Sequence, residues 1–214
     1  MNFIRNRNFR AGPQTSLEGF ICPQNSDKQQ KIKVFGRSGG DYIEAYLLEE
    51  SFKVTLWFRI GTYLQQRRNL FPLYMLIKII YKHVQHKTGI QLPCGTKVDE
   101  GLRFFHHDCI IVAQSVKIGK NVSIHQGVTI GRVFNGKKAG VPIIGDNVVI
   151  FAGAKILGNV IIGNGAVIGA NAVVINDVPS NSVVAGIPAT IISQDSSKCF
   201  NKTWGEVFAH SYYE

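Results

Sequence analysis

The stretch IGDNVVIFAGAKILGNVIIGNGAVIGANAVV, residues 144–174, decides the fold, because an aliphatic residue recurs in it at every sixth position. The same spacing extends upstream. The positions in phase are Leu92, Val98, Phe104, then Val112, Ile118, Ile124, Ile130, then Ile144, Ile150, Ile156, Ile162, Ile168 and Val174. Neither a helix with a period of 3.6 nor an alternating strand has this repeat. A hexapeptide repeat predicts a parallel β-helix, in which three short strands complete one coil and the coils stack about 4.8 Å apart.

The repeat is interrupted twice, and both interruptions are candidate places for a site. From Phe104 to Val112 the spacing is eight residues, and the two extra residues fall within Phe105-His106-His107-Asp108-Cys109. From Ile130 to Ile144 the spacing is fourteen, and Arg132–Gly140 is polar or small, which predicts an external loop. Since a solenoid is otherwise a uniform prism, function is expected where its period changes.

Composition limits the function classes. The net charge is +10, which suits either an ordinary basic surface or attraction to phosphates on a cofactor, an acidic glycan or an anionic lipid surface. No nucleic-acid recognition motif accompanies the charge, so nucleic acid is not expected as a partner. The cysteines Cys22, Cys94, Cys109 and Cys199 have no CxxC spacing, which argues against a zinc site or a disulfide framework. No signal-like or membrane-spanning stretch stands out, so we expect a cytoplasmic protein.

Four segments are predicted along the chain. Residues 1–40 are basic and polar and are expected to be poorly ordered; residues 41–89 form a helical region; residues 90–192 form the β-helix; residues 193–214 form a tail. Within the helical region one helix is expected over 41–66, and a second begins near Pro72 and stops at Gly89. Basic and aromatic residues on these helices suit either a solvated face or peripheral contact with the inner membrane. The apolar tail is expected to fold back on the solenoid end and cover strand edges.

The repeat region resembles the serine acetyltransferase branch of the left-handed β-helix, hexapeptide-repeat acyltransferases. The resemblance is carried by Asn121–Gly131, Ala152–Asn159, Ile168–Ala170 and Val184–Ala189, and it covers about residues 90–192. The pair His106-His107 and the segment Phe58–Gly61 are also similar to the acetyltransferases of bacterial exopolysaccharide clusters, including the colanic acid cluster.

This resemblance implies a left-handed β-helix that forms a homotrimer and binds acetyl-CoA in grooves between subunits. It places His106 at the catalytic position, where an imidazole acts as general base on the acceptor hydroxyl. His107 is its neighbour, and His125, one coil further, is a candidate acceptor-binding residue or alternative base. Small residues at Gly131, Ala152 and Ala170 match the cofactor groove, and Lys137, Lys138 or Lys155 are candidates for the CoA phosphates.

Three departures from the family pattern bear on the acceptor. The aspartate that the resemblance pairs with the histidine is Gln91 here, and Phe105 precedes the histidine, so Asp108, Gln91 or a backbone carbonyl is expected to orient the imidazole. The loop positions that carry an arginine and a second histidine in the family are Gly140 and Val141. Because the clamp for a serine carboxylate is missing, a sugar hydroxyl in surface polysaccharide biosynthesis is the predicted acceptor.

Alternative functions follow from the same residues. Serine O-acetylation in cysteine biosynthesis and N-acetylation of an amino sugar use the same base and cofactor. A γ-type carbonic anhydrase needs two zinc-binding histidines five residues apart, and Ile130 occupies the position that would pair with His125, so no metal is expected. A non-catalytic solenoid would need a regular threonine-rich face, which the chain lacks. An adaptor for a membrane or protein partner remains open through the basic helices.

Overall fold

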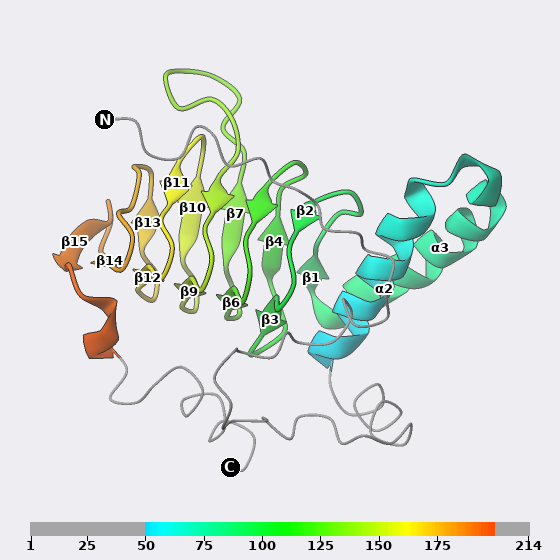
Figure 1. Cartoon of the computed structure of the whole chain (residues 1–214), viewed down its shortest axis with the longest axis horizontal. Coiled ribbons are helices and arrows are strands. Elements are labelled where there is room, and N and C mark those ends of the chain that lie inside the picture. Colours follow the sequence, from blue (N-terminus) through cyan, green and yellow to red (C-terminus); the bar gives the residue numbers. More distant parts are fainter. Residues whose placement is uncertain (1–49, 200–214) are drawn as a thin grey trace, which may run out of the picture.

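The computed structural model describes residues 50–199, which form a three-sided solenoid of parallel strands with a helical hairpin at its first coil (Figure 1). The predictions for residues 1–40, for the start of the first helix at 41–49 and for residues 200–214 lie outside the described residues.

The strands form three sheets, and consecutive strands of the chain pass from one sheet to the next. Sheet A contains β1 (Ile90–Gln91), β4 (Ile110–Val112), β7 (Thr129–Gly131), β10 (Lys155–Leu157) and β13 (Val173–Val174). Sheet B contains β2 (Lys97–Val98), β5 (Lys117–Ile118), β8 (Ile143–Ile144) and β11 (Ile161–Ile162). Sheet C contains β3 (Arg103–Phe104), β6 (Ser123–Ile124), β9 (Val149–Ile150), β12 (Val167–Ile168), β14 (Val183–Ala185) and β15 (Thr190–Ser193). Within the described solenoid, strands of successive coils pair in parallel, as a β-helix requires. The exception among the strands is the antiparallel pair β14 and β15 at the last coil.

The core confirms the six-residue repeat. Every aliphatic residue in phase, from Leu92 to Val174, is buried inside the solenoid together with Phe104. A second buried set lies two residues before the first and fills the corners; it consists of Val116, Val122, Val128, Val148, Ala154, Val160, Ala166 and Ala172. Each coil therefore buries two residues per side, which explains how such short strands are held together.

The helical region is a hairpin of α2 (Glu50–Gln65) and α3 (Phe71–Thr88), joined by the short 3₁₀ helix η2 (Arg68–Leu70). The second predicted helix is confirmed, because Pro72 lies in its first turn and Gly89 ends it with a left-handed φ of 65°. Proline needs no intrahelical partner at that position, and glycine adopts the left-handed conformation without a steric cost.

The hairpin covers the open edge of the first coil. The Tyr81 hydroxyl and the Gln85 amide donate to the Leu92 carbonyl at 2.6 and 2.9 Å. The Arg59 guanidinium donates to the Val98 carbonyl at 2.6 Å and also to that of Asp99. These contacts give partners to carbonyl groups that have no earlier coil to bind them.

At the other end of the solenoid, β15 pairs antiparallel with β14 and the 3₁₀ helix η3 (Ser196–Cys199) follows. Strand β15 contains Ile191 and Ile192, and both side chains are exposed. The chain thus folds back on β14 through β15, whereas the prediction for the aromatic residues of the tail lies outside the described residues.

The two interruptions of the repeat lie at opposite ends of the strands of sheet A. Residues Phe105–Cys109 connect β3 of sheet C to β4 of sheet A, and this segment is called the histidine corner below. Residues 132–142 connect β7 of sheet A to β8 of sheet B and form the predicted external loop, which projects from the solenoid (Figure 1). The width of sheet A therefore separates the two irregular segments within one chain.

Candidate active site

The histidine corner has a constrained backbone. Asp108 and Cys109 follow one another with φ values of 83° and 53°, a conformation that residues other than glycine rarely adopt. Hydrogen bonds hold the corner from both sides, since the Asp108 N–H donates to the Thr88 carbonyl of α3 at 2.9 Å and the Gly127 N–H donates to the Asp108 carbonyl at 3.0 Å. The end of α3 and the next coil thus fix the two inserted residues.

Three rings from successive coils stack beside this corner. Phe105, His125 and Phe151 each follow a strand of sheet C, after β3, β6 and β9, and we call them the ring column. The His125 ring lies 4.8 Å from Phe105 at an angle of 10° and 5.0 Å from Phe151 at 27°, measured between centroids. The imidazole is therefore sandwiched between two aromatic faces and has little rotational freedom.

A backbone hydrogen bond fixes the remaining freedom of His125. Its Nδ1 lies 3.1 Å from the Ile150 carbonyl oxygen, and because a carbonyl only accepts, Nδ1 carries the proton in this contact. Nε2 of the neutral ring is then an acceptor. Burial lowers the pKa of His125, the Ile150 hydrogen bond opposes this, and nearby His106 lowers it further. Near pH 7 His125 is a neutral imidazole of defined tautomer.

His106 lies next to His125, as the spacing predicts, with ring centroids 6.2 Å apart and planes inclined by 54°. Its side chain is exposed, and within residues 50–199 it makes no hydrogen bond. Orientation of this ring by Asp108, Gln91 or a backbone carbonyl therefore stays a prediction, whereas the His125 ring is oriented by the Ile150 carbonyl. His107 is also exposed and takes no part in the ring column.

The predicted cofactor residues fall in two places. Ala152 and Ala170 lie in adjacent coils just after the ring column, and the Asn171 N–H donates to the Ala152 carbonyl at 2.9 Å. Gly131 ends β7 at the far edge of sheet A, where a side chain would meet Leu157. The three small residues therefore do not line one surface of a single chain.

The candidate lysines differ in their availability. The Lys155 ammonium donates to the Gly127 carbonyl and to the Thr129 hydroxyl, the latter at 3.2 Å, so this half-buried group already has hydrogen-bond partners. Lys137 and Lys138 are exposed on the loop, and Lys138 pairs with Asp177 at 3.5 Å. An exposed pair of this kind is weak and leaves the ammonium accessible to a phosphate.

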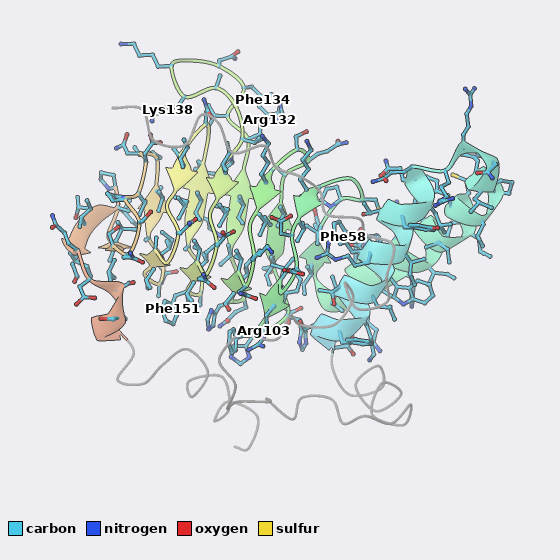
Figure 2. The ribbon with its side chains drawn as sticks, in the orientation of Figure 1. Phe58, Arg103, Arg132, Phe134, Lys138 and Phe151 are labelled. Carbon is cyan, nitrogen blue, oxygen red and sulfur yellow. The ribbon has the colours of Figure 1, made fainter. Side chains whose placement is uncertain are left out.

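The external loop carries cations, though not at the two positions singled out in the sequence. The N–H and carbonyl groups of Val133 and Gly140 bond each other at 3.0 and 2.8 Å, which closes the base of the loop. Gly140 and Val141 are half-buried at this base. Arg132, Phe134 and Lys138 lie on the side of the solenoid opposite Arg103 and Phe151 (Figure 2). No group of three or more metal-binding side chains occurs among the described residues.

The sequence analysis missed Phe151 and the role of Phe105. The signal was present, because Phe105, His125 and Phe151 each directly follow an inward residue of the repeat, namely Phe104, Ile124 and Ile150. Allowing for the inserted residues places the three in equivalent positions of successive coils, which predicts contact between their side chains.

Comparison with known proteins identifies the family. Residues 142–176 match the family described as bacterial transferase hexapeptide (six repeats). The chain is 36% identical over 159 residues to a serine acetyltransferase of Bacillus licheniformis, a match that covers 73% of this chain and 71% of the relative. The chain belongs to the hexapeptide-repeat acetyltransferase family. A serine acetyltransferase of Staphylococcus xylosus is 42% identical over 139 residues, which are 64% of this chain and 61% of that protein.

Solved structures agree with this assignment and with the predicted left-handed β-helix. A serine acetyltransferase in complex with CoA is 34% identical, with a TM-score of 0.59 over 70% of this chain and 60% of that chain. The soybean apoenzyme is 32% identical, with a TM-score of 0.62 over 74% and 64%. This chain spans about 61–63% of the first curated relatives it matches. Their names favour the serine alternative over the predicted polysaccharide function.

The predicted membrane behaviour is tested only in one respect. No helix among residues 50–199 has the length and apolar character needed to cross a bilayer.

Proposed function

We propose that this chain transfers an acetyl group from acetyl-CoA to a hydroxyl group, with His106 as the general base. The observation that carries the proposal is the position of His106. It occupies the catalytic position by family resemblance, on a constrained corner and beside a second histidine of fixed tautomer. Family membership supports acetyl-CoA as the donor, and a related solved structure contains CoA.

The chemistry requires one base. Neutral His106 removes the proton of the acceptor hydroxyl while its oxygen attacks the thioester carbonyl. The carbon–sulfur bond of the tetrahedral intermediate then breaks, and the imidazolium returns the proton to the CoA thiolate. Since a free hydroxyl is a poor nucleophile near pH 7, removal of this proton contributes about 10²–10⁴ to the rate.

We propose that His125 positions His106. The ring column and the Ile150 carbonyl hold His125 so that Nε2 is available to accept a hydrogen bond. With 6.2 Å between the centroids, the ring nitrogens are too far apart for a direct hydrogen bond, but one water or a rotation of the exposed His106 side chain would join them. His125 then fills the orienting role that the resemblance gives to an aspartate at the position of Gln91, and it stabilises the imidazolium as it forms.

For the acceptor, L-serine is the candidate that the names of the relatives support. A sugar hydroxyl is a second candidate, because Gly140 and Val141 offer no cation for a carboxylate where the family carries an arginine and a histidine. The two half-buried aromatic neighbours of the site, Phe105 and Phe151, also suit the apolar face of a sugar ring better than a small zwitterion.

A homotrimer is proposed for the assembly. Within one chain, sheet A separates the histidine corner from the external loop, and Gly131 from Ala152 and Ala170. A neighbouring copy placed against sheet A brings one chain's corner toward another chain's loop, which is the arrangement that the resemblance implies.

The test is thiol release from acetyl-CoA, measured with L-serine, a panel of sugars and glycans, and matching amino sugars. Wild type is compared with His106→Ala and with the matched control His107→Ala. Acceptor-dependent release that His106→Ala abolishes and His107→Ala retains supports the proposal, and the acceptor that gives release decides between serine, a sugar hydroxyl and an amine. Release that is unaffected in His106→Ala overturns the assignment of the base.

A further inference from the structure

Helix α3 presents an apolar face to solvent. Its inner side, with Tyr74, Tyr81 and Thr88 at intervals of seven residues, is buried. The opposite side of its first three turns exposes large hydrophobic residues, which form the outward face of α3: Phe71, Leu73, Met75, Leu76 and Ile79. Ile79 is 66% exposed and Phe71 57%. All five lie between Phe71 and Ile79 of one helix, whereas exposed apolar residues are normally scattered singly.

The same hairpin is strongly basic. No aspartate or glutamate occurs between Ser51 and Val98, a stretch that contains eight lysine and arginine residues. Arg67 and Arg68 lie exposed at the turn of the hairpin beside Phe71, and Lys78 and Lys82 lie exposed along α3. The apolar face is therefore bordered by positive charge at its tip and along its length.

The apolar side chains and the cations around them decide which kind of partner can cover this face. A second copy of the same face would bring two such sets of cations together, and no acidic residue between Ser51 and Val98 would oppose them, which disfavours self-association. An anionic lipid surface offers phosphates to the arginines and lysines and hydrocarbon to the apolar side chains. A helix with apolar residues on one face and cations beside them lies in the interfacial plane rather than across the bilayer.

We propose that the outward face of α3 binds the surface of an anionic lipid bilayer. The five apolar side chains enter the headgroup–acyl boundary, and Arg67, Arg68, Lys78 and Lys82 contact lipid phosphates. The hairpin lies at one end of the solenoid (Figure 1), and the Asp108 N–H bond to Thr88 joins the end of α3 to the histidine corner. Docking by α3 therefore holds the candidate site close to the membrane surface.

The test is sedimentation of the full chain with vesicles of phosphatidylcholine, with and without phosphatidylglycerol, at low and high salt. We expect binding only to the vesicles that contain phosphatidylglycerol, weakened by salt. Ile79→Asp should lower the partition coefficient more than about tenfold. The matched control Ile192→Asp, at 65% exposure on β15, should leave it unchanged. Lys82→Gln should lower it about fivefold, whereas Lys97→Gln, which removes an exposed lysine outside the helix, should not.

Light scattering and thiol release on the same samples separate the other outcomes. Absence of vesicle binding, equal binding to neutral vesicles, or equal loss in Ile79→Asp and Ile192→Asp overturns the proposal. A particle mass that falls in Ile79→Asp, with no vesicle binding by wild type, assigns the face to a second copy instead. Because vesicle binding is measured without acetyl-CoA, failure of acetyl transfer leaves this result standing, and the reverse also holds.

Discussion

Replacing His125 by phenylalanine separates its packing from its chemistry. In the structure the imidazole contributes two stacked contacts, at 4.8 and 5.0 Å, and one Nδ1–H bond to the Ile150 carbonyl. A phenylalanine ring keeps both stacked contacts, each of about 0.5–1.5 kcal/mol, and loses a hydrogen bond with a net value of about 1 kcal/mol. The Ile150 carbonyl is not left unsatisfied, because the His125 backbone N–H also donates to it at 3.0 Å. We therefore expect the unfolding free energy to change by no more than about 1 kcal/mol.

Activity should fall far more than stability. If Nε2 of His125 accepts a hydrogen bond from His106 as the imidazolium forms, the lost bond has a charged donor and a value of about 1.5–3 kcal/mol. This corresponds to a decrease in kcat of about 10- to 150-fold with little change in KM. The measurements are steady-state thiol release from acetyl-CoA and urea unfolding of the same samples. His107→Phe is the matched control, since that exposed histidine takes no part in the ring column.

The pH profile adds a result that a packing role would not produce. In wild type both neighbouring imidazoles must be neutral for activity. The slope of log(kcat/KM) against pH on the acid side should therefore approach two, one for each protonation, whereas in His125→Phe it should fall to one. Wild-type kcat and an unchanged acid limb in His125→Phe would refute the positioning role. A greater loss in His125→Phe than in His106→Ala would assign the base to His125.

Two further predictions concern stability. Burial lowers the pKa of His125, so the unfolded chain binds a proton on this residue at a higher pH than the folded chain does. The free energy of unfolding should therefore fall as the pH drops below about 6.5. Urea titrations from neutral to acid pH should show a smaller fall for His125→Phe than for wild type. Asn147 turns a solenoid corner with a left-handed φ of 56°, and its side chain accepts a hydrogen bond from Asn121 at 3.2 Å. Asn147→Ala should lower the unfolding free energy by about 1–2 kcal/mol, and the control Asn147→Gly by clearly less, because glycine adopts this φ without strain. Equal losses for the two variants in thermal unfolding would contradict an effect of backbone strain.

The solenoid was predictable because its repeat acts locally and every residue in phase obeys it. Each aliphatic residue from Ile144 to Val174 is buried where its phase places it, and the shifts of phase after Phe104 and Ile130 mark the two places where the coil departs from regularity. A pattern of this kind survives in sequence since inward residues face only other inward residues of adjacent coils.

The ring column and the cap of the first coil depend on information that the repeat does not carry. The two inserted residues lengthen the chain between Phe105 and His125 to 20 residues, and the loop lengthens it between His125 and Phe151 to 26. Because neither spacing equals one regular coil, the sequence does not show directly that the three residues occupy equivalent positions of successive coils. The bonds from Arg59 to Val98 and Asp99 join residues about forty positions apart that belong to different kinds of structure. Their pairing is decided by how the hairpin docks, which no periodicity of either segment encodes.

The separation of the two irregular segments constrains how any acceptor is recognised. At about 3.3 Å per residue, the three residues of β7 alone carry the chain roughly 10 Å across sheet A, from the side of the histidine corner to the base of the loop. A histidine side chain at the corner does not bridge that width, and Arg132 and Lys138 on the loop lie on the other side of the prism (Figure 2). A single chain can therefore supply the base or the loop cations to one acceptor, but not both. If a neighbouring copy supplies the loop, each site of the assembly is completed by a loop that has Gly140 in place of the arginine that would bind a serine carboxylate. The choice between serine and a sugar hydroxyl is then a property of the oligomer.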